Sequence, residues 1–342
     1  MTKALSNKFA NMALLCAVLV VSIHIGRNDS VGSAAWFFGQ IVSSGVAGIA
    51  IPFFFFASGF FLAAHGHEPG WWPREVKKRS RTLLLPFVVW NVLFLLYSNG
   101  IQLLSNIVAH APLSRDLLTP SPLSIFGFDI FTSPALFVLW YVRSLFLLVL
   151  VSPCIFWLLR RLGWKVLLVF FLIYALIVPG DDDGSVRMML PFKWTFSLLG
   201  LFYFSLGAWV RQRGWNLMRI RNVSIPMLVV GLTAVGLSVA ASRFAWTLPF
   251  SLRPLKVFSL AIAIFGLMPT FSLPKWLSGC AFAIFILHCF CRFIPMTAFR
   301  HHTESLVGFL VVWVVTVSLC VAVTVVMRRF LPRVTGFLFG GR

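Results

Sequence analysis

The sequence has very little charge for its length. Asp, Glu, Lys and Arg together make up only 11% of the 342 residues, whereas hydrophobic residues make up 59%. A soluble domain carries roughly 25% charged residues, and the mean hydropathy of this chain is +0.92. Water therefore cannot be the main solvent of the protein, and the low charge excludes an ordinary soluble domain.

Cysteines are few and do not form the pattern of a metal or redox site. The six cysteines lie in or beside apolar runs, and no two of them form a Cys-x-x-Cys pair. We expect them to be small buried hydrophobic groups, without disulfides and without a bound metal.

Apolar runs of membrane-spanning length are abundant. A helix that crosses a bilayer needs about 20 mostly apolar residues, because lipid cannot hydrogen-bond an exposed backbone. Ten runs are found: 9–26, 44–64, 83–104, 135–159, 164–179, 194–210, 223–241, 255–272, 277–295 and 305–327. The first resembles a signal peptide, but the nine later runs favour an uncleaved span. The sequence thus predicts an all-α polytopic membrane protein of about ten transmembrane helices, with one domain over 1–342 and its largest loop at 105–134.

Lys and Arg are distributed unequally between the two sides of these spans. Nineteen of the 29 lie at the N-terminus, in even-numbered loops or in the C-terminal tail, and nine lie in or beside odd-numbered loops. Seven of the nine acidic residues are on the odd-numbered side. The positive-inside rule then places both termini in the cytoplasm. Topology and attraction to anionic membrane lipids explain the net charge, so no nucleic-acid partner is expected.

Two histidines lie where lipid would be expected. His24 ends the first span, and His288 lies about eleven residues into the ninth. Ionisable side chains within spans are costly and usually mark function, and an imidazole can accept a hydroxyl proton near neutral pH. The alternatives are a polar group at headgroup level for His24 and a structural hydrogen bond between helices for His288.

Two sets of basic residues are further candidates. Arg143 lies inside the fourth span, where a permanent charge needs a carboxylate, a cluster of carbonyl groups or a bound anion. The run Lys77-Lys78-Arg79-Ser80-Arg81 precedes the third span. It is either an ordinary stop-transfer flank or a phosphate-binding site, because Lys78 and Arg81 would share one helix face and could bind one polyanion.

The second span contains Pro52 and the pair Ser58-Gly59. Pro52 removes a backbone donor and Ser58-Gly59 weakens the turn after it, so the sequence predicts a kinked or broken helix. Broken helices occur where a span lines a cavity rather than lipid.

Taken in order, these features resemble the acyltransferase-3 family of membrane-bound acyltransferases. The likeness covers essentially the whole chain. Each motif alone is a weak signal, whereas all of them in this order are a specific one. These are His24, Pro52-Phe53-Phe54, Ser58-Gly59-Phe60, Lys77 to Phe87 with Trp90, Leu139 to Arg143, Tyr203-Phe204 with Leu206-Gly207, and Phe285 to His288.

The resemblance implies transfer of an acyl group, commonly acetyl, from cytoplasmic acyl-CoA (acetyl-CoA). The acceptor would be a hydroxyl of a cell-surface polysaccharide or of its lipid-linked precursor, at the bacterial cytoplasmic (inner) membrane. His24 would then be the catalytic histidine, and Arg143 or His288 could stabilise the oxyanion. The CoA site would involve Lys78, Arg79, Arg81 and Ser58.

Two positions depart from the family pattern. Members often carry Arg or Lys eleven residues before the histidine, where this chain has Ala13, and Asp after the arginine of the fourth span, where it has Ser144. No second Ser-His-Asp site is expected, because the esterase-like domain of some members is missing. Two other classes also fit a polytopic chain with few buried charges: a transporter or exporter of a glycan or lipid, for which the expected internal repeats are not seen, and a non-catalytic membrane scaffold.

Overall fold

The computed structural model describes residues 1–25, 30–108, 134–177, 187–190, 194–246, 252–299 and 305–341. Nearly all of the predicted loop 105–134 lies outside these residues. The seven acidic residues assigned to the odd-numbered side lie outside them as well.

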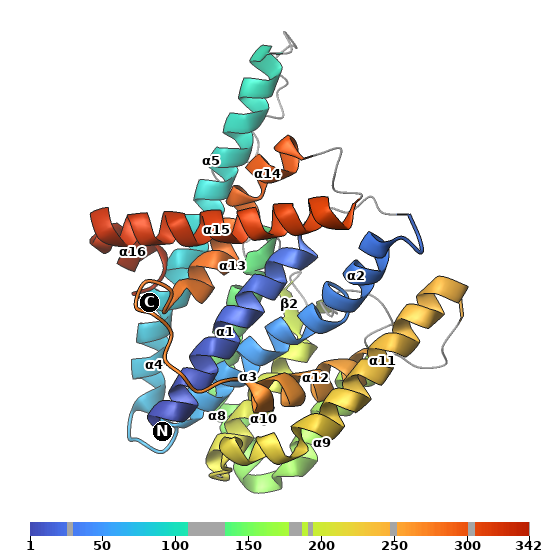
Figure 1. The fold of residues 1–342 in the computed structure, drawn as a ribbon. Coiled ribbons are helices and arrows are strands. Elements are labelled where there is room, and N and C mark those ends of the chain that lie inside the picture. Colours follow the sequence, from blue (N-terminus) through green and yellow to red (C-terminus); the bar gives the residue numbers. More distant parts are fainter. Residues whose placement is uncertain are drawn as a thin grey trace.

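The described chain consists almost entirely of helices (Figure 1). The N-terminal elements are α1 (Lys3–Ile23), α2 (Ala34–Val42), the 3₁₀ turn η1 (Val46–Ile49), α3 (Ala50–Ala63), α4 (Trp71–Arg79), the π-helical turn η2 (Ser80–Leu84), α5 (Leu85–Val108), the 3₁₀ turn η4 (Phe137–Leu139), α8 (Trp140–Leu162) and α9 (Trp164–Ile177). The C-terminal elements are β1 (Arg187–Leu190), β2 (Trp194–Ser197), α10 (Leu198–Gln212), the 3₁₀ segment η5 (Leu217–Val223), α11 (Ser224–Phe244), α12 (Arg253–Leu267), α13 (Cys280–Cys291), α14 (Phe293–Ala298), α15 (Leu306–Phe330) and α16 (Pro332–Leu338).

The predicted all-α class is confirmed, with one small addition. Within the described ranges, β1 and β2 form a single antiparallel pair of four residues each. The predicted run 194–210 therefore begins as a strand and becomes helical only at Leu198. Ser197 marks the change, because its side chain accepts a hydrogen bond from the N–H of Gly200 and so caps α10.

Seven helical stretches in the described chain are long and apolar enough to cross a membrane: Lys3–Ile23, Ala34–Ala63, Trp71–Ile101, Phe137–Leu162, Leu217–Phe244, Cys280–Ala298 and Leu306–Phe330. The other three predicted runs coincide with the shorter helices α9, α10 and α12, of 14, 15 and 15 residues. The protein is thus a multi-pass membrane protein. The count of ten spans and the cytoplasmic position of both termini stay predictions.

The interruption predicted in the second span lies before Pro52 rather than after it. Residues 43–45 and η1 separate α2 from α3, and α3 then begins at Ala50. Pro52 therefore lies in the first turn of α3, where its missing N–H has no intrahelical partner to lose. Ser58 and Gly59 belong to the continuous part of this helix.

Glycines bring α3 and α10 into close contact. A Cβ atom at Gly59 of α3 would lie 2.0 Å from the backbone oxygen of Phe204, and one at Gly207 of α10 would lie 2.0 Å from that of Phe56. Small residues at such crossings let membrane helices approach closely. Gly59 is thus explained by packing between helices, not by a weak turn.

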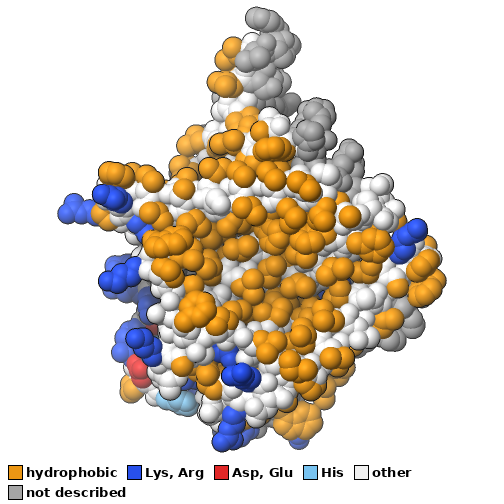
Figure 2. Space-filling model, in the orientation of Figure 1, with side chains coloured by type: hydrophobic (Ala, Val, Ile, Leu, Met, Phe, Trp, Pro, Cys, Tyr) orange, Lys and Arg blue, Asp and Glu red, His pale blue; other side chains and the backbone are white. Residues whose placement is uncertain are grey.

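One end of the molecule collects basic side chains. Met1, Ala64, Lys78 and Arg211 line a single cavity, so the start of α1 and the ends of α3, α4 and α10 meet there; we call this the basic end. On the face shown in Figure 2, hydrophobic side chains cover the middle, and most of the Lys and Arg lie along the left and lower edges. The two chain ends also lie toward the left in Figure 1.

Lys8 lies just before the predicted run 9–26, which would make it a charge that flanks the first span. The structure shows a different position. Lys8 lies inside α1 and is only 2% exposed. Its Nζ donates a hydrogen bond of 2.9 Å to the carbonyl oxygen of Gly266 and lies 5.4 Å above the ring of Phe265. Lys8 therefore joins α1 to the C-terminal turn of α12, where a cation is favourable.

Candidate acyl-transfer site

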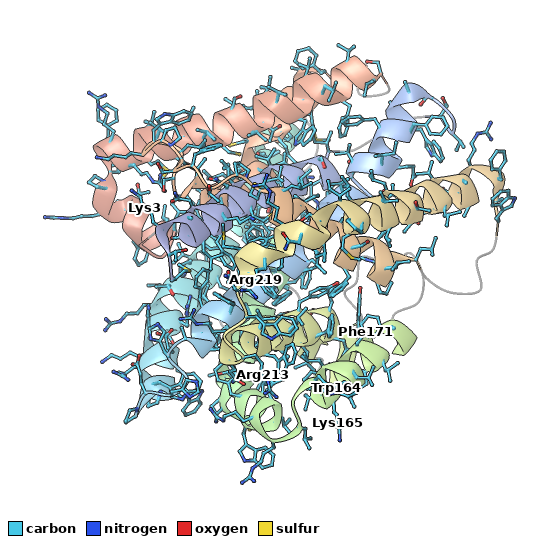
Figure 3. All side chains as sticks on the ribbon, turned by 60° about the horizontal axis from the view of Figure 1, so that its bottom comes forward. Lys3, Trp164, Lys165, Phe171, Arg213 and Arg219 are labelled. Carbon is cyan, nitrogen blue, oxygen red and sulfur yellow. The ribbon has the colours of Figure 1, made fainter. Side chains whose placement is uncertain are left out.

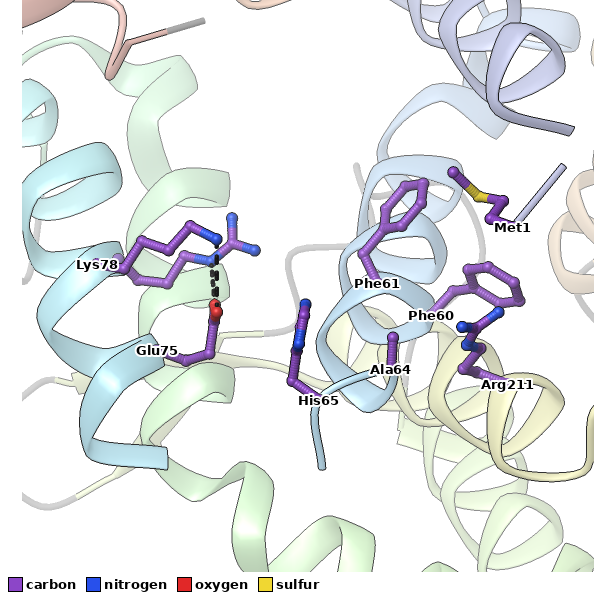
Figure 4. A pocket seen from close by; sticks show the side chains of 9 residues that line it. Met1, Phe60, Phe61, Ala64, His65, Glu75, Lys78 and Arg211 are labelled. Carbon is purple, nitrogen blue, oxygen red and sulfur yellow. Dashed lines mark hydrogen bonds and ion pairs between the residues drawn. The ribbon is translucent and has the colours of Figure 1, made fainter. Parts of the chain in front are cut away.

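A cavity of about 210 Å³ opens at the basic end, between α4 on one side and α3 with α10 on the other (Figure 4). Lys78 and Arg79 belong to the α4 wall. Arg211 lies on the opposite wall, with its guanidinium 5.3 Å from the centre of the Phe60 ring. We call this the entrance cavity. Its opposed cations form a site suited to phosphate groups.

A buried carboxylate holds the cations of α4 in place. Glu75 is 8% exposed, and its two oxygens lie 3.5 Å from Nζ of Lys78 and 3.3 Å from Nε of Arg79. With Arg211 included, these four side chains carry a net charge of +2. The cavity thus keeps a positive potential, and Glu75 holds two of the three cations, Lys78 and Arg79, that supply it.

A second acidic residue lies beside the entrance. Nδ1 of His65, which lines the cavity, is 3.0 Å from Oε1 of Glu68. This hydrogen bond holds the pKa of Glu68 below its usual value, and Arg74 acts in the same direction at 3.0 Å. Glu68 is therefore ionised at neutral pH.

A second cavity of about 390 Å³ adjoins the first and extends along α1 and α3. The two share Phe61 and Arg79, so Arg79 faces both. Ser58 lies on the wall of this inner cavity, as does Ala13. The small residue found where family members often have a basic one therefore enlarges the cavity rather than adding a charge to it.

Aromatic rings connect the inner cavity to the histidines. Tyr141 of α8 lines the cavity, and its ring lies 5.7 Å from that of Phe285 in α13. The ring of Phe285 lies 6.4 Å from that of His288. Successive ring contacts therefore link the wall of the inner cavity to His288.

The structure brings His24 and His288 together. Their rings stack with centroids 5.2 Å apart and an interplanar angle of 15°. His288 is fully buried, and its Nδ1 lies 3.2 Å from the carbonyl oxygen of Ile284. Because a carbonyl only accepts, Nδ1 carries a proton, and Nε2 faces the thiol of Cys289 at 3.5 Å. His24 is half-buried at the C-terminal cap of α1, so its ring is the more accessible of the two.

Arg292 supports His24 from α13. Its guanidinium donates a hydrogen bond to the backbone oxygen of His24 and lies 6.0 Å from the centre of the Phe137 ring. Phe137 in turn packs edge-on against the ring of His24 at 4.9 Å. Sequence reasoning missed this arginine. The available signal was its spacing, because residues four apart on a helix share a face and Arg292 follows His288 by four.

The segment that carries Phe137 is held by α5. Asn91 is fully buried; its side chain donates to the oxygen of Phe87 at 2.7 Å and accepts from the N–H of Leu136 at 3.1 Å. Asn91 therefore fixes the start of η4, and through Phe137 it fixes one side of His24.

Arg143 lies at the histidine end of the molecule. It is 8% exposed in the first turn of α8, directly after the η4 turn that contains Phe137. Its role in stabilising charge stays a prediction.

Arg81 is placed differently from Lys78 and Arg79. It is exposed and lies in the π-helical turn η2, which changes the spacing of side chains relative to an α-helix. The entrance and inner cavities are lined by Arg79 and not by Arg81. Lys78 therefore lines the entrance cavity and Arg81 does not, and a role for Arg81 in donor binding stays a prediction.

The basic end and the histidine pair are separated by the length of α1. Met1 lines the entrance cavity, whereas His24 caps the other end of the helix. A helix of 21 residues is about 31 Å long, which is close to the thickness of the hydrocarbon core. A donor bound at the basic end must therefore reach far along the inner cavity to meet His24.

A model of the acyltransferase domain family matches residues 14–329 and so includes both histidines, the cations of α4 and most of the inner-cavity wall. The chain belongs to the acyltransferase-3 family. A similar curated protein is the succinoglycan biosynthesis protein ExoH of Rhizobium meliloti (strain 1021), 26% identical over 210 residues. That match covers 60% of this chain, which spans about half (53%) of the relative's length. No solved structure shows a match.

Acyl transfer needs an acyl donor and a group that activates the acceptor. The cavities and the histidine pair are the described features with suitable chemistry for these two tasks.

Proposed function

We propose that this protein transfers an acyl group from acyl-CoA to a hydroxyl of a cell-envelope glycan or of its lipid-linked precursor. The family match supports acyl transfer. The name of the relative, which concerns biosynthesis of the polysaccharide succinoglycan, supports a glycan as acceptor. We place this activity in the cytoplasmic membrane of a bacterium and assign it to a single domain over 1–342, with acetyl-CoA as the first donor to test.

One observation carries the proposal: two adjoining cavities extend from a cluster of cations, and ring contacts link the second cavity to a histidine pair. The phosphates of CoA would bind Lys78, Arg79 and Arg211 at the entrance cavity, because guanidinium and ammonium groups are the usual partners of phosphate. The narrow, mostly apolar inner cavity would take the thioester arm, with Ser58 on its wall.

His24 is the proposed general base. It would remove the proton from the acceptor hydroxyl, whose oxygen attacks the thioester carbonyl carbon. The carbon–sulfur bond then breaks. The CoA thiolate leaves and takes up the proton that His24 removed from the hydroxyl. His24 suits this role better than His288 because it is half-buried, whereas His288 is 0% exposed and cannot meet a glycan directly.

Positive groups near the pair would stabilise the oxyanion that forms during attack. Arg292 contacts the backbone of His24, and Arg143 lies buried at the same end of the molecule. Donors aimed at a developing charge are commonly the largest contribution to catalysis.

The test uses the full-length protein in detergent with acetyl-CoA and candidate glycans. We expect release of CoA to require an acceptor and to match the acetyl groups found on the glycan. The same protein in vesicles separates this function from that of a transporter. Movement of a glycan across the bilayer, without consumption of acyl-CoA, would contradict the proposal.

A further inference from the structure

A third cavity, of about 280 Å³, lies between α3, α10, η5 and α12. Phe53 lines both this lateral cavity and the inner cavity, so one side chain of α3 separates them. The described side chains that line the lateral cavity are aliphatic or aromatic, and the hydroxyl of Tyr203 and the indole nitrogen of Trp215 are the only polar groups among them. This cavity therefore belongs to neither the entrance nor the histidine pair.

The lateral cavity continues into a polar hollow at the surface. Trp215, Ile220 and Val223 line both the cavity and an open hollow of about 570 Å³ that also includes Asn216 and Arg219. Arg219 is exposed, and residues 194–246 contain no Asp or Glu. A cation thus stands at the mouth of an apolar cavity, with no acidic residue in its own segment to neutralise it.

The mouth lies at the level expected for lipid headgroups. Figure 3, which brings the lower part of the molecule forward, shows Arg213 and Arg219 between Lys3 of α1 and Lys165 of α9. The hollow follows directly after α10, whose Arg211 faces the entrance cavity at the basic end. The apolar cavity therefore begins beside the charged surface and extends into the region of apolar helices.

The size and lining limit what can occupy this cavity. An apolar cavity stays dry and takes apolar ligands. One turn of a helix, about 10 Å across and about 5 Å long, has a larger volume than the cavity, so a partner helix does not fit. The lining offers almost no hydrogen-bonding groups for a sugar. A segment of a single hydrocarbon chain fits, and phospholipids, which surround any membrane protein, combine such a chain with a phosphate.

We propose that the lateral cavity binds one acyl chain of an anionic phospholipid, and that Arg219 binds its phosphate. The chain lies against Phe258, Ala261 and Ile262 of α12, and the phosphate lies in the hollow beside Trp215 and Asn216. This site is independent of the proposed acyl transfer, because it shares no cation with the entrance cavity.

Two variants of the full-length protein test the two halves of the site. Ala261→Trp fills the cavity, and Arg219→Gln removes the cation. Their controls are Ala322→Trp on an exposed position of α15 and Arg160→Gln at the end of α8, which is also exposed. Each protein is incubated in detergent with equal amounts of phosphatidylglycerol and phosphatidylcholine, and the lipids retained are counted by native mass spectrometry.

We expect the wild type and both controls to retain one phosphatidylglycerol that Ala261→Trp lacks. Arg219→Gln should weaken its binding about tenfold, as the loss of one charge-assisted contact does, and should reduce the preference over phosphatidylcholine. Retention by Ala261→Trp equal to that by Ala322→Trp would overturn the proposal. So would an Arg219→Gln protein that binds like Arg160→Gln, and because Arg219 is exposed this variant should fold normally. Inorganic phosphate alone should not displace the lipid; displacement at equal concentration would show a phosphate site instead.

Discussion

Replacing Arg79 with glutamine should weaken binding of the acyl donor without affecting the acceptor. Arg79 lines both the entrance and the inner cavity, and its side chain is only 21% exposed, against 60% for Lys78. Solvent therefore screens its charge less. Glutamine keeps much of the side-chain length, and Glu75 keeps its contact with Lys78 at 3.5 Å, so the buried carboxylate is not left alone.

The size of the effect follows from the loss of one contact to a charged group. Such a contact contributes roughly 1.5–3 kcal/mol, which corresponds to an increase of about 10-fold to 150-fold in the KM for acyl-CoA if the contact forms with bound donor. The KM for the glycan and the kcat should change little. The measurement is steady-state release of CoA at saturating acceptor, with the donor concentration varied.

Two comparisons make the assay specific. Arg81→Gln removes an exposed cation that lines neither cavity, and it should raise the donor KM less than Arg79→Gln does. Acetyl-pantetheine lacks the CoA phosphates, so wild type and Arg79→Gln should use it with equal KM. An equal donor KM for wild type and Arg79→Gln with acetyl-CoA, in correctly inserted protein, would refute a phosphate role for Arg79.

Three further predictions concern the scaffold and the topology. Gly59→Val should prevent close packing of α3 on α10 and lower the yield of folded protein, because even a Cβ would lie 2.0 Å from a backbone oxygen; Gly236→Val, with open space around it, should be tolerated, and equal yields would contradict the packing argument. Arg292→Ala should lower kcat about tenfold, as expected for a lost charged contact, with donor KM unchanged and partial rescue by lysine; a change in donor KM alone would contradict its positioning of His24. Reporter fusions after Arg342 and within 65–80 should both report cytoplasm, and an outward C-terminus would refute the ten-span topology.

The membrane class and the helical runs could be predicted because they depend on local composition. Each span must satisfy its own backbone in lipid, so a run of apolar residues is enough to indicate it. Hydropathy does not distinguish an α-helix from a 3₁₀ turn, however. The apolar run 44–64 therefore does not indicate that η1 ends and α3 begins within it. For the same reason, hydropathy does not separate strand β2 from the helix that follows it in the run 194–210.

Contacts between distant residues account for most of what the sequence could not indicate. Stacking of His24 on His288 joins residues 264 positions apart, and the hydrogen bond from Arg292 joins residues 268 positions apart. The two histidines could be predicted as candidate site residues from the sequence, because an ionisable group in a span is unusual. From the sequence alone Arg292 and Arg211 are only charges that flank spans, because nothing local shows that either faces a cavity or a histidine.

Single-turnover transfer by His24→Ala tests the central claim most directly. Loss of a general base typically costs roughly 10²–10⁴-fold in rate, so His24→Ala should lose nearly all transfer while its expression and CoA binding match the wild type. His288→Ala, which removes the fully buried partner, should cost less or should act through stability in the membrane. If His24→Ala kept more than about a tenth of the wild-type rate, which is outside the range for a lost base, His24 would not be the base and His288 would become the first candidate.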